Sequence, residues 1–264
     1  GTRLLPLTSV FAKELLPING KPGLEYILDE CIEAGIKEVI FIISKKKMMI
    51  KKYFYNDKFY KDIIKKKGDP KIIKEYKKIL KYKKMIKFVF QDKPLGTGDA
   101  VYKTKKFITD KYFLMLLPDD LIIKKNCSKS MILVHKKFKA SVMASMKVNK
   151  SDVTRWGIYN IKKKIDKNNF IINNVVEKPS IKTSPSNYAV IGRYILPKTI
   201  FSKLKSLKPG KSGEFHITDA IQALIEDDHQ FIGHNFSGKY LDCGTMNGYI
   251  KSTLEISKQW NFAW

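Results

Sequence analysis

The alternation of short apolar runs with amphipathic stretches constrains the fold of this chain more than any other feature. Residues 38–43 and 112–117 are largely apolar on both faces, as strands buried in a parallel sheet are. Residues 25–34 have the period of an amphipathic helix, which Gly35 ends. Strands that alternate with helices in this way are typical of an α/β sandwich with a central, mostly parallel sheet.

The rest of the chain continues this alternation. Further strands are expected at residues 85–90, 140–148, 157–161, 170–176 and 188–196. Further helices are expected at residues 71–84, 100–107, 131–138, 200–207 and 218–227. No internal repeat or low-complexity linker divides the chain, so we expect a single domain over residues 1–264. Because ligands bind beyond the carboxyl ends of strands in such sheets, functional residues should directly follow the strands.

The charge balance raises the question of a nucleic-acid partner. The formal net charge is +26, yet 48 of the 51 basic residues are Lys and only three are Arg. Surfaces that grip phosphates or read bases favour Arg, because its planar fork pairs bidentately. The lysine runs also lack regular aromatic interleaving. We therefore expect no dedicated nucleic-acid partner and interpret most lysines as solvated surface charge.

Cysteine usage and hydropathy exclude several other classes. Cys31, Cys127 and Cys243 lie far apart, which excludes a disulfide framework or a zinc ribbon and indicates a reducing compartment. No apolar run approaches the ~18 residues of a membrane helix. We expect a cytoplasmic protein without a membrane partner. No G-x-S-x-G or Cys/His pattern is present, so a covalent nucleophile is not expected.

Two glycine-containing clusters could bind a nucleotide. Gly1-Thr2-Arg3, with Lys13 further on, could offer backbone N–H groups and cations to phosphates. Gln91 follows the predicted strand 85–90, and its amide could pair with the imide edge of a pyrimidine. A tight turn with surface cations and a solvent-facing glutamine are the structural alternatives.

Acidic residues follow two apolar runs. Asp119 and Asp120 come after the predicted strand 112–117, and Asp242 ends a later run. Carboxylate oxygens are the ligands that Mg²⁺ prefers. We expect Asp119 and Asp242 to face a shared metal and Asp120 to point elsewhere. Acidic capping turns are the alternative.

A third group of residues could hold a phosphorylated sugar. Glu177 and Lys178 stand together at a strand end, where a carboxylate could accept from hydroxyls and an ammonium could hold a phosphate. Gly192 inside a strand indicates the close approach of a ligand or of another backbone. A surface ion pair of little energetic value is the alternative for Glu177 and Lys178.

The order of these motifs resembles that of the bacterial UTP–glucose-1-phosphate uridylyltransferases, within the sugar nucleotidyltransferase superfamily. The likeness runs over nearly the whole chain. The motifs that carry it are Gly1-Thr2-Arg3, Lys13-Glu14-Leu15-Leu16-Pro17, Gln91, Gly96-x-Gly98, Leu117-Pro118-Asp119-Asp120, Glu177-Lys178-Pro179, Gly192-Arg193-Tyr194, Thr218-Asp219-Ala220 and Asp242-Cys243-Gly244.

This resemblance implies a Rossmann-like nucleotidyltransferase sandwich and an Mg²⁺-assisted reaction. The phosphate of glucose 1-phosphate would attack the α-phosphorus of UTP in line, giving UDP-glucose and pyrophosphate. A homodimer or homotetramer would be usual. By resemblance, Arg3, Lys13 and Lys178 would be catalytic cations, Gly1, Thr2, Gln91 and Gly96 would bind the nucleotide, Gly157, Glu177, Lys178 and Gly192 would bind the sugar, and Asp119 and Asp242 would bind the metal.

The chain departs from the family pattern at several positions. Asp92 and Asp99 stand where Gly and His are usual, and Thr97 with Asp99 is similar to related nucleotidyltransferases. The family's first strand would precede Gly1 and is missing from the printed chain. Two alternatives therefore stay open: a related enzyme such as a thymidylyltransferase, and a non-catalytic Lys-rich nucleic-acid-binding protein.

Overall fold

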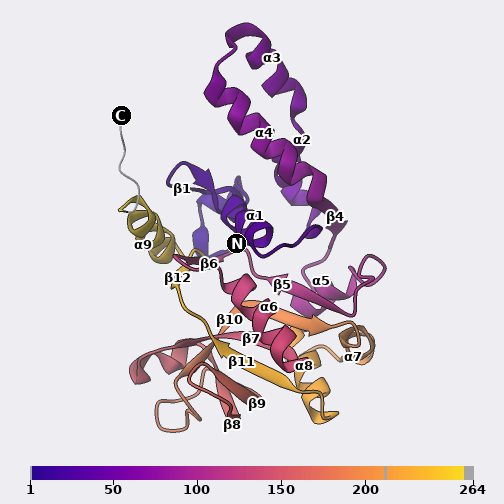
Figure 1. The fold of residues 1–264 in the computed structure, drawn as a ribbon, viewed down its shortest axis with the longest axis vertical. Coiled ribbons are helices and arrows are strands. Elements are labelled where there is room, and N and C mark those ends of the chain that lie inside the picture. The colour runs from indigo at the N-terminus through magenta and orange to yellow at the C-terminus, as the bar shows by residue number, and fades with distance from the viewer. Residues whose placement is uncertain (1, 211–212, 259–264) are drawn as a thin grey trace.

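The computed structural model describes residues 2–210 and 213–258, so Gly1 and the strand expected before it lie outside the described residues. The fold is mixed α/β, with a helical arm that projects from a sheet-rich body (Figure 1). The expected α/β class is therefore confirmed.

The elements have the following bounds. The strands are β1 (Pro17–Ile18), β2 (Lys21–Pro22), β3 (Val39–Ile43), β4 (Ile86–Phe90), β5 (Tyr112–Leu116), β6 (Asp120–Ile123), β7 (Ser141–Lys147), β8 (Gly157–Lys164), β9 (Asn169–Glu177), β10 (Tyr188–Pro197), β11 (Phe231–Asn235) and β12 (Lys239–Asp242). The α-helices are α1 (Gly23–Glu33), α2 (Met48–Tyr55), α3 (Asp57–Lys67), α4 (Pro70–Met85), α5 (Thr97–Tyr102), α6 (Cys127–Phe138), α7 (Ile200–Ser206), α8 (Ile217–Glu226) and α9 (Met246–Ser257). Short 3₁₀ helices are η1 (Thr2–Leu4), η2 (Leu7–Ser9), η3 (Lys13–Leu15), η4 (Lys45–Lys47) and η5 (Lys150–Arg155).

The direction of the strands corrects the expectation of a mostly parallel sheet. The six-stranded sheet has the order β5-β10-β7-β11-β9-β8, and in the described chain only its β7–β11 pair is parallel. A separate parallel pair joins β3 to β4. Apolar residues on both faces indicate a strand covered on both sides, not its direction. Strand β10 is buried on both faces yet runs antiparallel to β5 and β7.

Helices cover both faces of the six-stranded sheet, as expected for a sandwich. Alternate residues of β10 enter two different cores. Tyr194 and Leu196 pack in a cluster with Phe201 of α7 and residues of α8. On the opposite face, Ile195 packs in a cluster with Met131 of α6. By the same alternation, Arg193 lies on the α6 side of the sheet.

The helical arm consists of α2, α3 and α4 and projects from the body (Figure 1). Helix α4 matches the expected helix at 71–84, and Asp69 caps it by accepting a 2.7 Å hydrogen bond from the Lys71 N–H. Helices α2 and α3 were not predicted. Tyr60 of α3 and Tyr76 of α4 stack with their ring centroids 5.1 Å apart, which joins the two helices.

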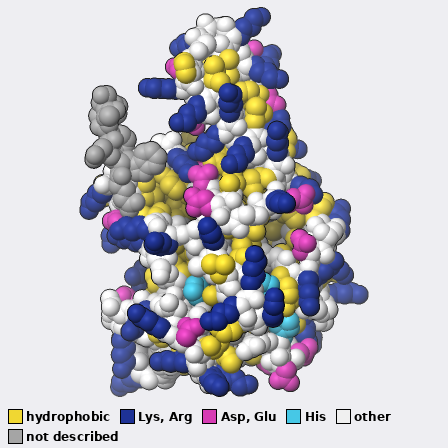
Figure 2. Space-filling view, viewed as in Figure 1, with side chains coloured by type: hydrophobic (Ala, Val, Ile, Leu, Met, Phe, Trp, Pro, Cys, Tyr) yellow, Lys and Arg dark blue, Asp and Glu magenta, His cyan; other side chains and the backbone are white. Residues whose placement is uncertain are grey.

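Basic side chains are spread over both the arm and the body. Figure 2 shows Lys and Arg scattered over one face rather than gathered in a single groove. This distribution matches the interpretation of most lysines as solvated surface charge. Among the described residues, no helix combines the length and apolar character that crossing a bilayer requires.

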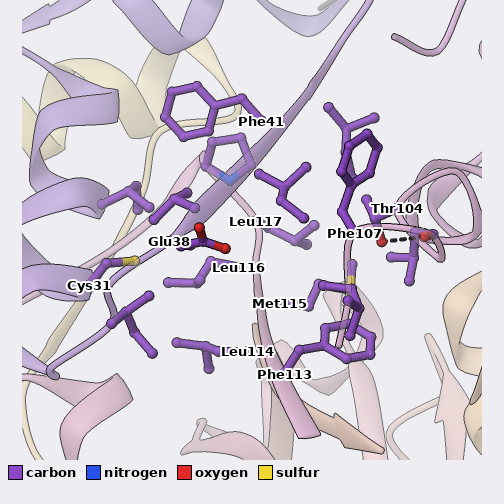
Figure 3. A pocket seen from close by; sticks show the side chains of 18 of the residues that line it. Cys31, Glu38, Phe41, Thr104, Phe107, Phe113, Leu114, Met115, Leu116 and Leu117 are labelled. Carbon is purple, nitrogen blue, oxygen red and sulfur yellow. Dashed lines mark hydrogen bonds between the residues drawn. The ribbon is translucent and has the colours of Figure 1, made fainter. Parts of the chain in front are cut away.

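A cavity of about 790 Å³ lies between β3 and β5. Figure 3 shows Phe41 of β3, Cys31 of α1, and Phe113, Leu114 and Leu116 of β5 around it. Within the described chain, β3 and β5 are each paired along one edge only. The lining is mainly apolar and includes none of the predicted catalytic or metal-binding residues, so this cavity is not the candidate active site.

Candidate active site

The two predicted metal ligands lie side by side where β5 and β12 lead into loops. Strand β12 pairs with β6, and Asp242 is in register with Asp120. The Cys243 N–H donates a 2.8 Å hydrogen bond to the Asp119 carbonyl oxygen. These backbone contacts bring together two carboxylates that are distant in the sequence.

The side chains of Asp119, Asp242 and Arg3 converge on Gly244. A Cβ atom at Gly244 would lie 2.8 Å from Asp119 Oδ2, 3.2 Å from Asp242 Oδ1 and 3.4 Å from an Arg3 guanidinium nitrogen. Any residue with a side chain would therefore disturb this group. The absence of a side chain at Gly244 lets two acids and one cation share a small space.

Lys13 holds Asp119 in its charged form. The Lys13 ammonium donates a 2.6 Å hydrogen bond to Asp119 Oδ2. Burial on its own would raise the pKa of Asp119, but Lys13 outweighs burial and Arg3 adds to the effect, so the pKa lies below its usual range. The carboxylate is therefore ionised at neutral pH and available to a cation.

The Asp242 carboxylate is fixed by its own turn. Asp242 Oδ1 accepts a 2.7 Å hydrogen bond from the Gly244 N–H, and Oδ2 accepts one of 3.3 Å from the Thr245 hydroxyl.

The described residues hold no group of three or more His, Cys, Asp or Glu side chains suited to a metal. A pair of carboxylates fits a hard divalent cation such as Mg²⁺, which takes one or two carboxylates beside phosphate and water.

Asp120 points away from this pair, as expected. Its Oδ1 accepts a 2.6 Å hydrogen bond from the Tyr240 hydroxyl, and its Oδ2 accepts one of 2.9 Å from the Gly192 N–H. Burial raises the pKa of Asp120. A Cβ atom at Gly192 would lie 2.5 Å from Asp120 Oδ2 and 2.6 Å from the Leu117 Cβ. A glycine at 192 thus makes room for the side chains of Asp120 and Leu117, whereas the sequence suggested a ligand or another backbone as the cause.

The predicted sugar residues form a separate group on β8 and β9. Gly157 is in register with Glu177, and a Cβ atom at Gly157 would lie 3.0 Å from Glu177 Oε2. The Lys178 N–H bonds to the Trp156 carbonyl oxygen at 2.9 Å, with Lys178 in the left-handed region at φ 46°. The Glu177 and Lys178 side chains are 72% and 63% exposed and 4.0 Å apart. Their mutual attraction is therefore screened, and both are accessible to a ligand.

The predicted base residues form a third group. Gln91 Nε2 donates to the Gly96 carbonyl oxygen at 3.0 Å and to Asp99 Oδ2 at 2.8 Å. Gly96 has a φ of 96°, and a Cβ atom there would lie 2.5 Å from the Phe215 carbonyl oxygen. The glycine is thus required by the loop that carries Phe215. Gly98 donates a 2.7 Å hydrogen bond to the same oxygen.

The three groups are distinct in the described chain, where no hydrogen bond or ion pair joins the Asp119 group, the Glu177 group and the Gln91 group. Gly1 and the side chain of Thr2 lie outside the described residues. A second cavity of about 740 Å³ is lined by Asp242, Arg3 and Arg155, among others. Two of the three arginines of the chain therefore border it, which suits an anionic ligand.

Arg193 and Glu30 support the 117–120 loop, and neither role could be predicted from the sequence. Arg193 is fully buried, and its guanidinium contacts both carboxylate oxygens of Glu30, at 2.9 Å to Oε2 and 3.2 Å to Oε1. It also donates to the Leu117 carbonyl oxygen at 3.0 Å and to the Asp120 carbonyl oxygen at 2.6 Å. The scarcity of arginine and the Gly192-Arg193-Tyr194 motif drew attention to Arg193 without giving it a role. No feature of the sequence indicates that Arg193 forms an ion pair with Glu30.

The chain is similar to a known protein family and to named enzymes over nearly its whole length. The family model described as nucleotidyl transferase matches residues 1–259. A UTP–glucose-1-phosphate uridylyltransferase of Staphylococcus saprophyticus is 35% identical over 97% of this chain and 88% of its own. The Bacillus subtilis enzyme of the same name is 34% identical over 98% and 88%.

Solved structures of UDP-glucose pyrophosphorylases are also similar to this chain over nearly its whole length. A UDP-glucose pyrophosphorylase in complex with UDP-glucose has a TM-score of 0.85 and 32% identity, covering 98% of this chain and 95% of its own. The UTP-bound enzyme from Acinetobacter baumannii has a TM-score of 0.89 and 28% identity, covering 99% and 91%.

Proposed function

Because the chain belongs to the nucleotidyl transferase family, we propose that it transfers the uridylyl group of UTP to glucose 1-phosphate, giving UDP-glucose and pyrophosphate. Relatives and solved structures that carry this activity in their names match nearly the whole chain. The observation in the structure that best supports the proposal is the convergence of Asp119, Asp242 and Arg3 on Gly244, with Lys13 on Asp119.

The reaction brings two anions together, so it needs positioning and positive charge rather than a protein nucleophile. A phosphate oxygen of glucose 1-phosphate attacks the α-phosphorus of UTP in line, and pyrophosphate leaves. Arg3 and Lys13 lie beside the acid pair, where their charge would stabilise the phosphates of UTP as negative charge develops. Gly1 and Thr2 would complete the phosphate loop.

Asp119 and Asp242 would hold a divalent cation, for which we propose Mg²⁺. The support is their chemistry: two fixed carboxylates, of which Asp242 lines a cavity that Arg3 and Arg155 border. When bound, the cation supplies positive charge and orientation to the triphosphate. Lys13 keeps Asp119 ionised in readiness for it.

Residues of β8, β9 and β10 would receive the sugar phosphate. Glu177, exposed at its strand end beside Gly157, would accept hydrogen bonds from glucose hydroxyls. Lys178 would hold the phosphate, and Gly192 would line the hexose side of the site. Gln91 and the backbone at Gly96 would bind uracil.

The proposal extends to domain organisation, assembly and location. We propose that residues 1–264 form one domain that assembles as a homodimer or homotetramer, without a dedicated nucleic-acid or membrane partner. The three cysteines are free and buried, which suits a reducing compartment and supports the cytoplasm as its location.

Pyrophosphate release tests the proposal. The protein is assayed with UTP, dTTP, CTP, ATP and GTP, each against glucose 1-phosphate and other sugar 1-phosphates. The proposal predicts fastest release with UTP and glucose 1-phosphate, dependent on added Mg²⁺. Faster release with dTTP would indicate a thymidylyltransferase instead. No release with any pair, together with salt-resistant binding to DNA or RNA, would favour the nucleic-acid-binding alternative.

A further inference from the structure

The side-chain amide of Gln91 is held with its nitrogen directed at two acceptors of the protein itself. Gln91 follows β4, and Asp99 lies in the first turn of α5. Gln91 Nε2 donates to the Gly96 carbonyl oxygen and to Asp99 Oδ2, at 3.0 and 2.8 Å. A carbonyl and a carboxylate can only accept, so the amide group between them must be the NH₂. Chemistry fixes the orientation of this amide.

Both hydrogens of Nε2 are therefore in use, whereas Gln91 Oε1 makes no hydrogen bond among the described residues. The side chain has an acceptor to offer and no donor. Flipping the amide would place Oε1 against two acceptors at once, so the unflipped state is strongly preferred.

We propose that Asp99 is a positioning residue that sets the base specificity of the enzyme by fixing the polarity of Gln91. The inference rests on the proposed function, which places the base at Gln91. A carbonyl acceptor accepts a hydrogen bond from the N3–H of uracil or thymine. Cytosine carries a lone pair at N3, which this acceptor repels. Asp99 thus favours imide bases over cytosine without touching the nucleotide.

Asp99 has a second partner. Its other carboxylate oxygen, Oδ1, lies 3.7 Å from the Lys103 ammonium, one helical turn further along. This contact orients the carboxylate so that Oδ2 faces Gln91. The Gly96 carbonyl oxygen alone holds just one of the two amide hydrogens, so the second contact depends on Asp99.

The isosteric variant Asp99→Asn isolates this effect. An asparagine can offer Nδ2 to Gln91 Oε1 as readily as it can offer Oδ1 to Nε2, so residue 99 no longer favours either orientation of the Gln91 amide. Only the Gly96 carbonyl oxygen then opposes the flip. Asp92→Asn is the matched control, because it makes the same chemical change nearby. The Asp92 side chain is 60% exposed and lies 3.8 Å from the Lys45 ammonium. Among the described residues it makes no hydrogen bond to the Gln91 side chain, whose partners are Gly96 and Asp99.

The test compares kcat/KM for UTP, dTTP and CTP with glucose 1-phosphate in the wild type and both variants. Asp99→Asn should reduce the preference for UTP over CTP by about tenfold or more, and the preference for dTTP over CTP in parallel. Asp92→Asn should leave both ratios unchanged. A purely structural role for Asp99 would lower activity with all triphosphates equally, and an unchanged UTP-to-CTP ratio would overturn the proposal.

Calorimetric binding of UTP and CTP separates this inference from the proposed function. If the wild type binds UTP more tightly than CTP and Asp99→Asn loses that preference, the inference holds even where no sugar 1-phosphate reacts. If the wild type binds the two equally, Asp99 does not set base specificity. Equal melting temperatures for the wild type and Asp99→Asn show that the fold is intact in the comparison.

Discussion

Replacing Arg193 by methionine should destabilise the fold far more than an ordinary substitution. Arg193 is fully buried and faces Glu30, which is 7% exposed. Methionine preserves much of the apolar stem but removes the guanidinium, so the Glu30 carboxylate stays buried without its cation. Ser128 still donates to Glu30 from its N–H and hydroxyl, which compensates only in part.

The expected magnitude follows from these contacts. Removing one partner of a buried ion pair costs about 3–5 kcal/mol. The Leu117 and Asp120 carbonyl oxygens each lose a donor, although the Leu117 oxygen keeps the Asp120 N–H at 3.4 Å. A buried acceptor left without a donor costs about 1–3 kcal/mol. We therefore expect a loss of at least about 4 kcal/mol, a large share of the ~5–15 kcal/mol that stabilises a domain.

Urea unfolding of three variants measures this loss. Arg193→Met should lower the free energy of unfolding by the amount above. The double variant Arg193→Met, Glu30→Met should be more stable than Arg193→Met, because it leaves no buried charge unpaired. Glu30→Met alone should resemble Arg193→Met. A loss below about 1 kcal/mol for Arg193→Met, or additive losses in the double variant, would refute the reasoning.

Three further predictions concern the site. Lys178→Ala should raise the KM for glucose 1-phosphate more than that for UTP and cost about 2–4 kcal/mol in kcat/KM; equal changes for both substrates would leave Lys178 as a surface partner of Glu177. Gln91→Leu should erode discrimination among triphosphates, because an imide edge then meets no partner; unchanged selectivity in a competition assay would assign base reading to the backbone. The pKa of Asp119 is lower in the folded protein than in the unfolded chain. The pair with Lys13 therefore stabilises the fold fully at a pH above the unfolded pKa, and this stabilisation is lost as the pH falls through the folded pKa. Urea unfolding from pH 7 to pH 3 should therefore show the largest deficit of Lys13→Met at neutral pH, and a deficit that does not depend on pH would contradict this.

Strand ends could be predicted from the sequence because burial and strand length are local properties. Asp119 and Asp242 each follow an apolar run, and the structure brings them to one place at Gly244. Gln91 likewise follows a strand as expected, and its contact with Gly96 is an addition from the structure. In these cases the residue type and its position after a strand carried the information.

Properties that depend on distant partners could not be predicted. The apolar pattern of β10 does not reveal that its neighbours run antiparallel, because direction depends on chain connections. Glu30 has the position of an ordinary helix residue, yet it is buried by pairing with Arg193, 163 positions away. Helices α2 and α3 of the arm have only 8 and 11 residues, lengths at which a helix depends on tertiary packing more than on its own sequence.

The dependence of turnover on Mg²⁺ tests the proposed active site most directly. UDP-glucose formation is measured against Mg²⁺ concentration for Asp119→Asn, Asp242→Asn and Asp120→Asn. Each change keeps side-chain shape and removes one charge. We predict that Asp119→Asn abolishes most turnover with an intact fold, that Asp242→Asn does so less severely, and that Asp120→Asn, whose carboxylate faces Tyr240 and Gly192, is the mildest. An inactive Asp120→Asn beside a nearly normal Asp119→Asn, or no response to Mg²⁺ in any of the proteins, would contradict the assignment.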